Sequence, residues 1–338
     1  MRILSFMLVV VLLVAAYTGY GFYAWRHPLN GAAQTIIIPP HTGARGAVAL
    51  LSGQGLVPPL GVMALPLLLS GDLEKMKAGE YEFAANTAPA DIIAKIARGE
   101  IVIHKITIPE GWNSYQVRDA LLKEPLLTGT LPQLPEGSLL PDTLRFDRGE
   151  ARSAVVARMQ KAQGELMQKL WPTHDTASPI TTPQQALILA SLVEKETGVD
   201  AERGQVAGVF VNRLRLGMML QTDPSVAYGI EVAQGGATLG RALTRNDLLA
   251  DTAYNTYTRV GLPPTPICNP GKAAIEAALH PAATDALYFV ATGTGGHHFA
   301  ATLAEHEKNV EAYRAVVKAA TQPRANATTS SSNPNSRN

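Results

Sequence analysis

Two neighbouring glutamates near the end of an apolar segment are the first residues in this chain that could carry acid–base chemistry. The segment ALILASLVEKETG spans residues 186–198 and contains Glu194 and Glu196. Helix-start signals precede it, a pair of threonines followed by Pro183, and Gly198 is a helix-stop signal. At about 100° per residue, Glu196 falls within the apolar sector of this helix, whereas Glu194 falls almost opposite.

The two carboxyl groups are therefore expected to have different environments. Glu194 should be solvated or ion-paired, and ionised. Glu196 should face the core or a cleft, where desolvation raises the pKa of a carboxyl group. A carboxyl that stays protonated near neutral pH is what a glycosidic general acid requires. The alternative is a structural ion pair between Glu196 and Arg213 or Arg215, and the residues alone leave both interpretations open.

Further polar residues follow this helix in a concentration that packing does not require. Residues 202–216 are expected to form a second amphipathic helix, which carries Asn212 on or beside its inner face. Amides, hydroxyls and aromatic rings of this kind suit a sugar-binding groove, although turn chemistry and surface tyrosines are an alternative for each residue alone. The candidate substrate-binding residues are Asn212, then Gln221, Thr222 and Asp223 around a predicted proline turn, and then Asn255 and Tyr257.

A metal site and a cofactor are not expected. His297, His298 and His306 are the only clustered candidates, but adjacent side chains on a strand point apart and no carboxylate has ligand spacing. Cys268 is the single cysteine, so the chain can form no internal disulfide. We expect it to be a small buried hydrophobe.

The N-terminus predicts a membrane anchor over residues 1–27. Residues 3–25 carry no charge, and as a helix they would be about 34 Å long, at about 1.5 Å per residue, which is enough to cross a bilayer. The aromatic residues at its end suit a membrane–water interface. A cleavable signal peptide is the alternative, but its apolar core would be shorter and followed by small residues. Arg2 on one side is balanced by Arg26 and His27 on the other, so charge does not decide the topology.

The rest of the chain predicts an α+β protein. A small α+β module is expected at residues 34–108, a connecting helical and loop region at 109–183, and a mixed α+β domain at 184–320. The polar tail at 321–338 has no periodicity and should be disordered. The formal net charge of +1 gives no indication of a nucleic-acid surface.

The segments that hold these residues also resemble a known family. They are LASLVEKETG, ERGQVAGVFVNRLRLGMMLQTDPSVAYG, TAYNTYTRVGLPPTPICNPG and LYFVATGTGGHHF. In this order they look like the endolytic murein transglycosylases (MltG, or YceG-like), over roughly residues 184–317. The stretch KAGEYEF with DIIAKIARGE, within residues 34–108, is similar to the LysM-like module of that family.

The resemblance implies a single-pass protein of the inner (cytoplasmic) membrane with its catalytic domain, residues 184–320, in the periplasm. It implies cleavage within nascent peptidoglycan glycan strands, and association with peptidoglycan synthases. The catalytic glutamate of the family corresponds to Glu196, which agrees with the helix-face argument, and Glu194 is a secondary candidate. The expected reaction is a lytic transglycosylation, in which one glutamate is acid and then base and a 1,6-anhydro-N-acetylmuramic acid end forms without water.

Two other functions remain open on the residues. A lysozyme-type hydrolase would use Asp223 as the second carboxylate of a pair. A non-catalytic, membrane-tethered glycan-binding scaffold would depend on residues 34–108 instead.

Overall fold

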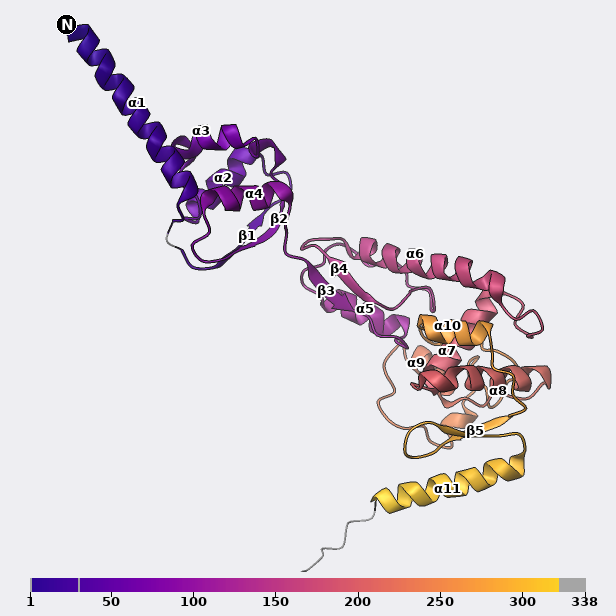
Figure 1. The fold of residues 1–338 in the computed structure, drawn as a ribbon. Coiled ribbons are helices and arrows are strands. Elements are labelled where there is room, and N and C mark those ends of the chain that lie inside the picture. The colour runs from indigo at the N-terminus through magenta and orange to yellow at the C-terminus, as the bar shows by residue number, and fades with distance from the viewer. Residues whose placement is uncertain (1, 30, 322–338) are drawn as a thin grey trace, which may run out of the picture. The chain divides into compact units, whose positions relative to one another are not determined.

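The computed structural model describes residues 2–29 and 31–321 of the chain, so the predicted tail at 321–338 lies almost wholly outside the described residues. It has two compact units that alternate along the sequence (Figure 1). The first comprises Met1–Thr107, Leu121–Pro132 and Thr143–Val155, and the second comprises Ile108–Ala120, Gln133–Asp142 and Val156–Asn338. The mixture of helices and short antiparallel strands confirms the expected α+β class.

The first unit begins with the long helix α1 (Arg2–Arg26), which is apolar enough and long enough to cross a membrane. It continues with β1 (Gln34–Ile38), α2 (Ala44–Gly53), α3 (Leu60–Ser70), β2 (Gly79–Phe83) and α4 (Pro89–Arg98), with a 3-10 turn at Leu73–Lys75. β1 and β2 pair antiparallel, with Ile36 opposite Tyr81. Ile92, Ile93 and Ile96 of α4 are fully buried, as the helical spacing predicts.

The end of α1 is part of this unit's core. Trp25 is only 6% exposed and packs in the same apolar cluster as Ile38 and Leu51. The Trp25 ring therefore fills space within the folded unit instead of facing outward from the helix. Tyr17, Tyr20 and Tyr23 of the same helix are exposed.

The third strand belongs to a separate sheet. β3 (His104–Thr107) pairs with β4 (Thr143–Phe146) and not with β1 or β2. The connecting region at 109–183 also holds α5 (Ser114–Lys123) and the long helix α6 (Arg152–Leu170), followed by a 3-10 turn at Trp171–Thr173.

The second unit is built around α7 (Pro183–Glu196), which packs against α8 (Arg203–Arg215) and α10 (Lys272–Leu279). It also contains α9 (Asp223–Ala233), the antiparallel pair β5 (Tyr288–Ala291) and β6 (His297–Ala300), and α11 (Leu303–Thr321). Two 3-10 turns lie at Asp200–Glu202 and Asp247–Leu249. α9 begins where the sequence predicts only a proline turn.

The start of α7 follows the predicted signals. Thr182 is its N-cap, and the Thr182 hydroxyl accepts a hydrogen bond from the Gln185 backbone N–H at 3.2 Å. The helix ends at Glu196, two residues before the predicted stop at Gly198. Leu189, Leu192 and Val193 are fully buried in the core of the unit. Their burial places Glu196, one turn later, at the edge of that core.

Candidate active site

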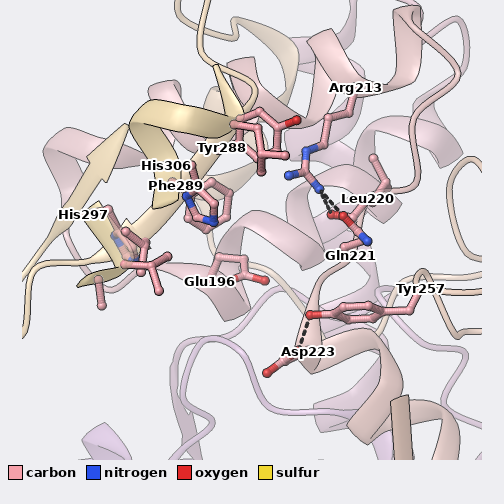
Figure 2. A pocket seen from close by; sticks show the side chains of 14 residues that line it. Glu196, Arg213, Leu220, Gln221, Asp223, Tyr257, Tyr288, Phe289, His297 and His306 are labelled. Carbon is pink, nitrogen blue, oxygen red and sulfur yellow. Dashed lines mark hydrogen bonds between the residues drawn. The ribbon is translucent and has the colours of Figure 1, made fainter. Parts of the chain in front are cut away.

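A pocket of about 590 Å³ lies in the second unit, with Glu196 on its wall (Figure 2). Phe289, His297 and His306 lie on one side of the Glu196 side chain, and Asp223 and Tyr257 on the other. The lining residues come from α7, α8, α9, β5, β6 and α11 and from the loops before and after α9: Glu196, Arg213, Leu220, Gln221, Asp223, Tyr257, Tyr288, Phe289, Val290, Ala291, His297, Leu303, His306 and Val310.

Burial raises the pKa of the Glu196 carboxyl group, as the helix-face argument predicts. Charged neighbours act in opposite directions on this group. The negative charge of Asp223 raises the pKa of Glu196 further, whereas His297 and Arg213 lower it. Because desolvation is the largest effect, the pKa remains raised. The site can therefore hold a proton at a pH where an exposed glutamate has lost it.

Thr222 donates a hydrogen bond from its hydroxyl to Oε1 of Glu196, and this bond lowers the pKa of the carboxyl group. Thr222 is 2% exposed and precedes the first residue of α9. Its backbone N–H donates to the Thr256 hydroxyl at 3.0 Å, and Ser225 donates to its carbonyl at 2.8 Å. These bonds fix the position of Thr222, so Glu196 has an oriented partner.

Asp223 and Tyr257 form a second pair on the pocket wall. The Tyr257 hydroxyl donates to Oδ1 of Asp223 at 2.6 Å. Burial and this hydrogen bond raise the pKa of Tyr257, so the phenol keeps its proton. Asp223 is exposed toward solvent, and one of its two oxygens remains available to a ligand hydroxyl.

Gln221 lines the pocket in a strained backbone conformation. Its φ is 52°, in the left-handed region that costs a residue with a side chain about 1 kcal/mol or more. Its backbone N–H donates to the Thr256 carbonyl at 3.1 Å, which holds the turn in place. Strain of this kind is common where a side chain must be aimed at a ligand.

Arg213 lies beside Glu196 but uses its donors elsewhere. Its Nε donates to the Leu287 carbonyl at 2.7 Å and its Nη1 to the Leu220 carbonyl at 2.9 Å. Its guanidinium also stacks on the Tyr288 ring, 5.2 Å from the centroid. Arg215, the other possible partner, donates to the Ala177 carbonyl at 3.0 Å. The structural ion pair considered for Glu196 is therefore not formed with either arginine.

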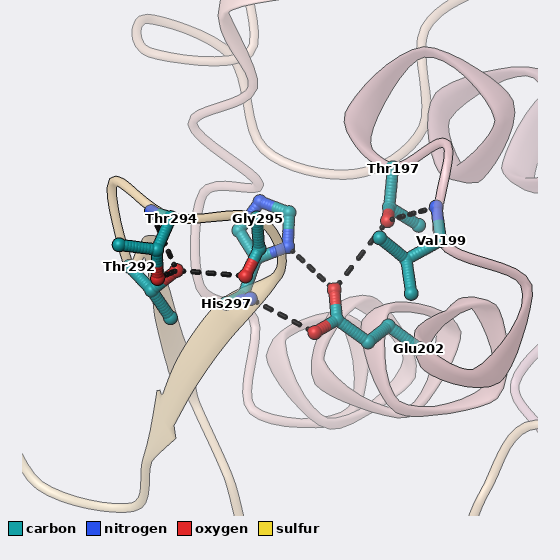
Figure 3. A network of polar contacts seen from close by, with 7 residues as sticks. All are labelled: Thr197, Val199, Glu202, Thr292, Thr294, Gly295 and His297. Atoms are coloured by element: carbon teal, nitrogen blue, oxygen red, sulfur yellow. Dashed lines mark hydrogen bonds and ion pairs between the residues drawn. The ribbon is translucent and has the colours of Figure 1, made fainter.

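His297 is held on the pocket wall by Glu202 (Figure 3). The backbone N–H of His297 donates to Oε1 of Glu202 at 2.9 Å, and Nδ1 lies 2.8 Å from Oε2. Because a carboxylate only accepts, Nδ1 carries the hydrogen. Thr197, directly after Glu196, also donates to Oε2 of Glu202 at 3.5 Å. This network joins the end of α7 to β6.

Not all of the candidate substrate-binding residues reach the pocket. Gln221, Asp223 and Tyr257 line it, and Thr222 contacts Glu196 from behind. Asn212 instead donates to the carbonyls of Thr284 and Ala286, at 2.8 and 3.1 Å. Asn255 is fully buried and donates to the carbonyls of Leu248 and Ala250. These two amides stabilise loops and do not line this pocket.

Glu194 also differs from its expected state. It is partly buried rather than solvated, and it accepts a hydrogen bond from the Gly271 backbone N–H at 3.1 Å. Burial raises the pKa of Glu194, and the nearby negative charge of Glu110 adds to this effect. Gly271 is the N-cap of α10, so Glu194 bonds the start of a neighbouring helix. It does not line the pocket.

Comparison with known proteins places this chain in a family. The sequence profile of the YceG-like family matches residues 36–312, most of the chain. The chain belongs to the YceG-like family. A crystal structure of a YceG-like protein from Listeria monocytogenes superposes with a TM-score of 0.51 at 29% identity, covering 82% of this chain and 98% of that one.

Two curated relatives of this YceG-like chain are named endolytic murein transglycosylase. The protein from Bacillus subtilis (strain 168) is 38% identical over 178 residues, which are 53% of this chain and 48% of the relative. The protein from Streptococcus pneumoniae serotype 2 (strain D39) is 28% identical over 282 residues, which are 70% of this chain and 50% of the relative. The chain thus spans about half the length of these relatives where it matches them.

Several pocket residues of this YceG-like chain were not expected from the sequence. Tyr288 and Phe289 lie on β5, and His306 lies on α11. His297, one of the clustered histidines, has its Nδ1 bonded to Glu202. The signal that could have found them is the density of aromatic residues and histidines in LYFVATGTGGHHF.

Proposed function

We propose that this chain is an endolytic lytic transglycosylase that cleaves the bond between N-acetylmuramic acid and N-acetylglucosamine within peptidoglycan strands. The observation that carries the proposal is the state of Glu196, a carboxyl group whose pKa is raised by burial on the wall of an open pocket. The printed name of the curated relatives supports the same activity.

The reaction needs only this one carboxyl group. Protonated Glu196 donates to the glycosidic oxygen as the bond from that oxygen to C1 of the muramyl residue breaks. The carboxylate then takes the proton of the C6 hydroxyl, whose oxygen bonds to C1 and closes the 1,6-anhydro ring. Glu196 ends protonated, as it began, and no water is consumed.

Other residues of the pocket would bind the sugars. Gln221 and Asp223 offer an amide and a carboxylate oxygen to sugar hydroxyls, and Tyr257 offers an aromatic face. Thr222 would orient the carboxyl group of Glu196 rather than touch the glycan.

The proposed location rests on α1. We propose that α1 is retained as a single-pass anchor in the inner membrane and that the pocket lies in the periplasm. The burial of Trp25 supports retention, because cleavage after the apolar segment would remove a core residue. Within this proposal residues 34–108 act as a LysM-like glycan-binding module, and peptidoglycan synthases are the expected protein partners.

Digestion of purified peptidoglycan by the full-length chain in detergent tests the proposal. The wild type should release muramyl ends one water lighter than hydrolysis products, measured by mass spectrometry. Glu196→Gln should lower the rate by about 10²–10⁴-fold, the usual contribution of a general acid. Glu194→Gln is the matched control, two residues away and outside the pocket, and should retain the activity.

Asp223 keeps a hydrolase as a second candidate, because its carboxylate lines the same pocket as Glu196. Full-mass reducing ends, lost in Asp223→Asn as completely as in Glu196→Gln, would establish the hydrolase instead. Cleavage by neither the wild type nor the variants would favour a glycan-binding scaffold.

A further inference from the structure

A short helix of the first unit presents leucines to its surroundings. α3, with the sequence LGVMALPLLLS, contains no charged residue. Met63 and Leu67 are buried in the core of the unit. On the other side Leu65, Leu68 and Leu69 are 42%, 69% and 68% exposed. Neighbouring exposed leucines of this kind mark an interaction surface rather than an ordinary solvated face.

α3 lies against α1 (Figure 1). The contact is close at Gly21 of α1, where a Cβ atom would lie 2.4 Å from the carbonyl oxygen of Val62. Only glycine permits this approach. The Tyr17 hydroxyl lies 3.5 Å from the position of a Cβ atom on Gly61. The start of α3 is therefore fixed at the level of residues 17–21 of α1.

This level corresponds to a membrane boundary if α1 spans the bilayer, and the inference rests on that part of the proposed function. A hydrocarbon core of about 30 Å takes about 20 helical residues. Counted from Ile3, the first residue of the uncharged segment, the core ends near Phe22. Tyr17 lies about 7 Å inside that end, at about 1.5 Å per residue. A helix packed there cannot be surrounded by bulk water.

We propose that α3 is an interfacial membrane helix, with Leu65, Leu68 and Leu69 inserted at the boundary between acyl chains and headgroups. The occupant of this face is lipid, because α3 packs at the level of residues 17–21 of α1, whose apolar window is 0% buried by the protein. The chain leaves the helix at Gly71, in a left-handed conformation, and the charged residues Asp72, Glu74 and Lys75 follow at once. They suit the polar headgroup region. α1 and α3 together would hold the first unit against the membrane surface.

Site-specific fluorescence of the reconstituted full-length chain tests this proposal. Leu68→Cys is labelled with the environment-sensitive dye NBD in vesicles of phosphatidylethanolamine and phosphatidylglycerol. Native Cys268 is fully buried and should not react. Leu122→Cys, an equivalent label at a leucine that is 47% exposed on α5, is the matched control. Val10→Cys, in the middle of α1, reports whether the anchor spans the bilayer.

The expected result is a blue-shifted Leu68→Cys emission, quenched by a nitroxide on a shallow acyl carbon and not by aqueous iodide. Leu122→Cys should show the reverse. An iodide-accessible label at Leu68→Cys, with Val10→Cys quenched by a deep nitroxide, would overturn the proposal while leaving the anchor intact. That outcome would point to a protein on this face. If Val10→Cys is also accessible to iodide, the membrane anchor itself fails and the inference fails with it.

Discussion

At the residue scale, Thr222 and Asp223 are neighbours in sequence that act on Glu196 in opposite directions. The Thr222 hydrogen bond stabilises the carboxylate and lowers the pKa of Glu196. Thr222→Val removes the donor at similar volume, so the pKa of Glu196 should rise further. Because the general acid must start protonated, the alkaline limb of the pH–rate profile should move to higher pH. Thr222→Ser keeps the hydroxyl and should keep the wild-type profile.

Asp223→Asn should move the alkaline limb of the pH–rate profile to lower pH. The negative charge of Asp223 raises the pKa of Glu196, so its removal lowers that pKa and the acid is lost at a lower pH. Asparagine still accepts the hydrogen bond from Tyr257, which limits the structural change. Profiles that move in the same direction for Thr222→Val and Asp223→Asn would contradict the assignment of Glu196 as the titrating acid.

Gln221 should show separate effects on stability and activity. Gln221→Gly relieves the positive φ of 52° and removes the side chain from the pocket. We expect an unchanged or raised melting temperature and a lowered rate of peptidoglycan cleavage. His41→Gly, at a φ of 62° outside the pocket, should relieve similar strain with no effect on the rate. Full activity in Gln221→Gly would show that the Gln221 side chain does not contact the glycan.

At the element scale, Glu194 links α7 to the start of α10. Glu194→Ala leaves the Gly271 N–H without its acceptor and should destabilise the protein by about 1 kcal/mol, as loss of a helix cap does. Glu194→Gln keeps an oxygen acceptor and should destabilise the protein less.

The stability that Glu194 contributes should depend on pH. The pKa of Glu194 is raised in the folded state, so its contribution to the free energy of unfolding is present at acid pH and is lost as pH rises through the folded pKa. Glu194→Gln should therefore gain stability relative to wild type as pH rises, measured by urea unfolding at several pH values. An advantage that shrinks with rising pH would contradict this.

The helices with clear local signals could be predicted from the sequence. Thr182 and Pro183 define the start of α7, and the 3.6-residue spacing of its leucines identifies the buried face that leads to Glu196. This placement depends only on local periodicity. For the same reason the buried faces of α4 and α8 follow from their spacing.

The remaining features depend on contacts between distant segments. β4 is four residues long and exists because it pairs with β3, which lies about forty residues earlier. Asn212 is as polar as the pocket residues, and only the fold shows that the backbone carbonyls of Thr284 and Ala286, about seventy residues later, accept its hydrogen bonds. Glu194 lies opposite Glu196 on a helical wheel, but α10 covers that face as well. Periodicity therefore separates the two glutamates without showing that both are desolvated.

At the scale of the whole molecule, α1 is both an apolar span and a part of the first unit's core. Trp25→Ala should destabilise that unit by about 3–5 kcal/mol, because it leaves a cavity among the residues packed on the indole. Tyr20→Ala, on the same helix but 59% exposed, should have little effect. Hydrogen exchange of the β1, β2 and α4 amides in the detergent-solubilised chain measures the difference. Removal of α1 would lower the stability of the first unit at least as much as Trp25→Ala, because it removes the same core side chain. We therefore expect the membrane-bound protein to keep its N-terminus. An intact mass lacking residues 1–25, together with unchanged exchange protection in Trp25→Ala, would show that the first unit folds without the helix and that α1 is a cleaved signal sequence.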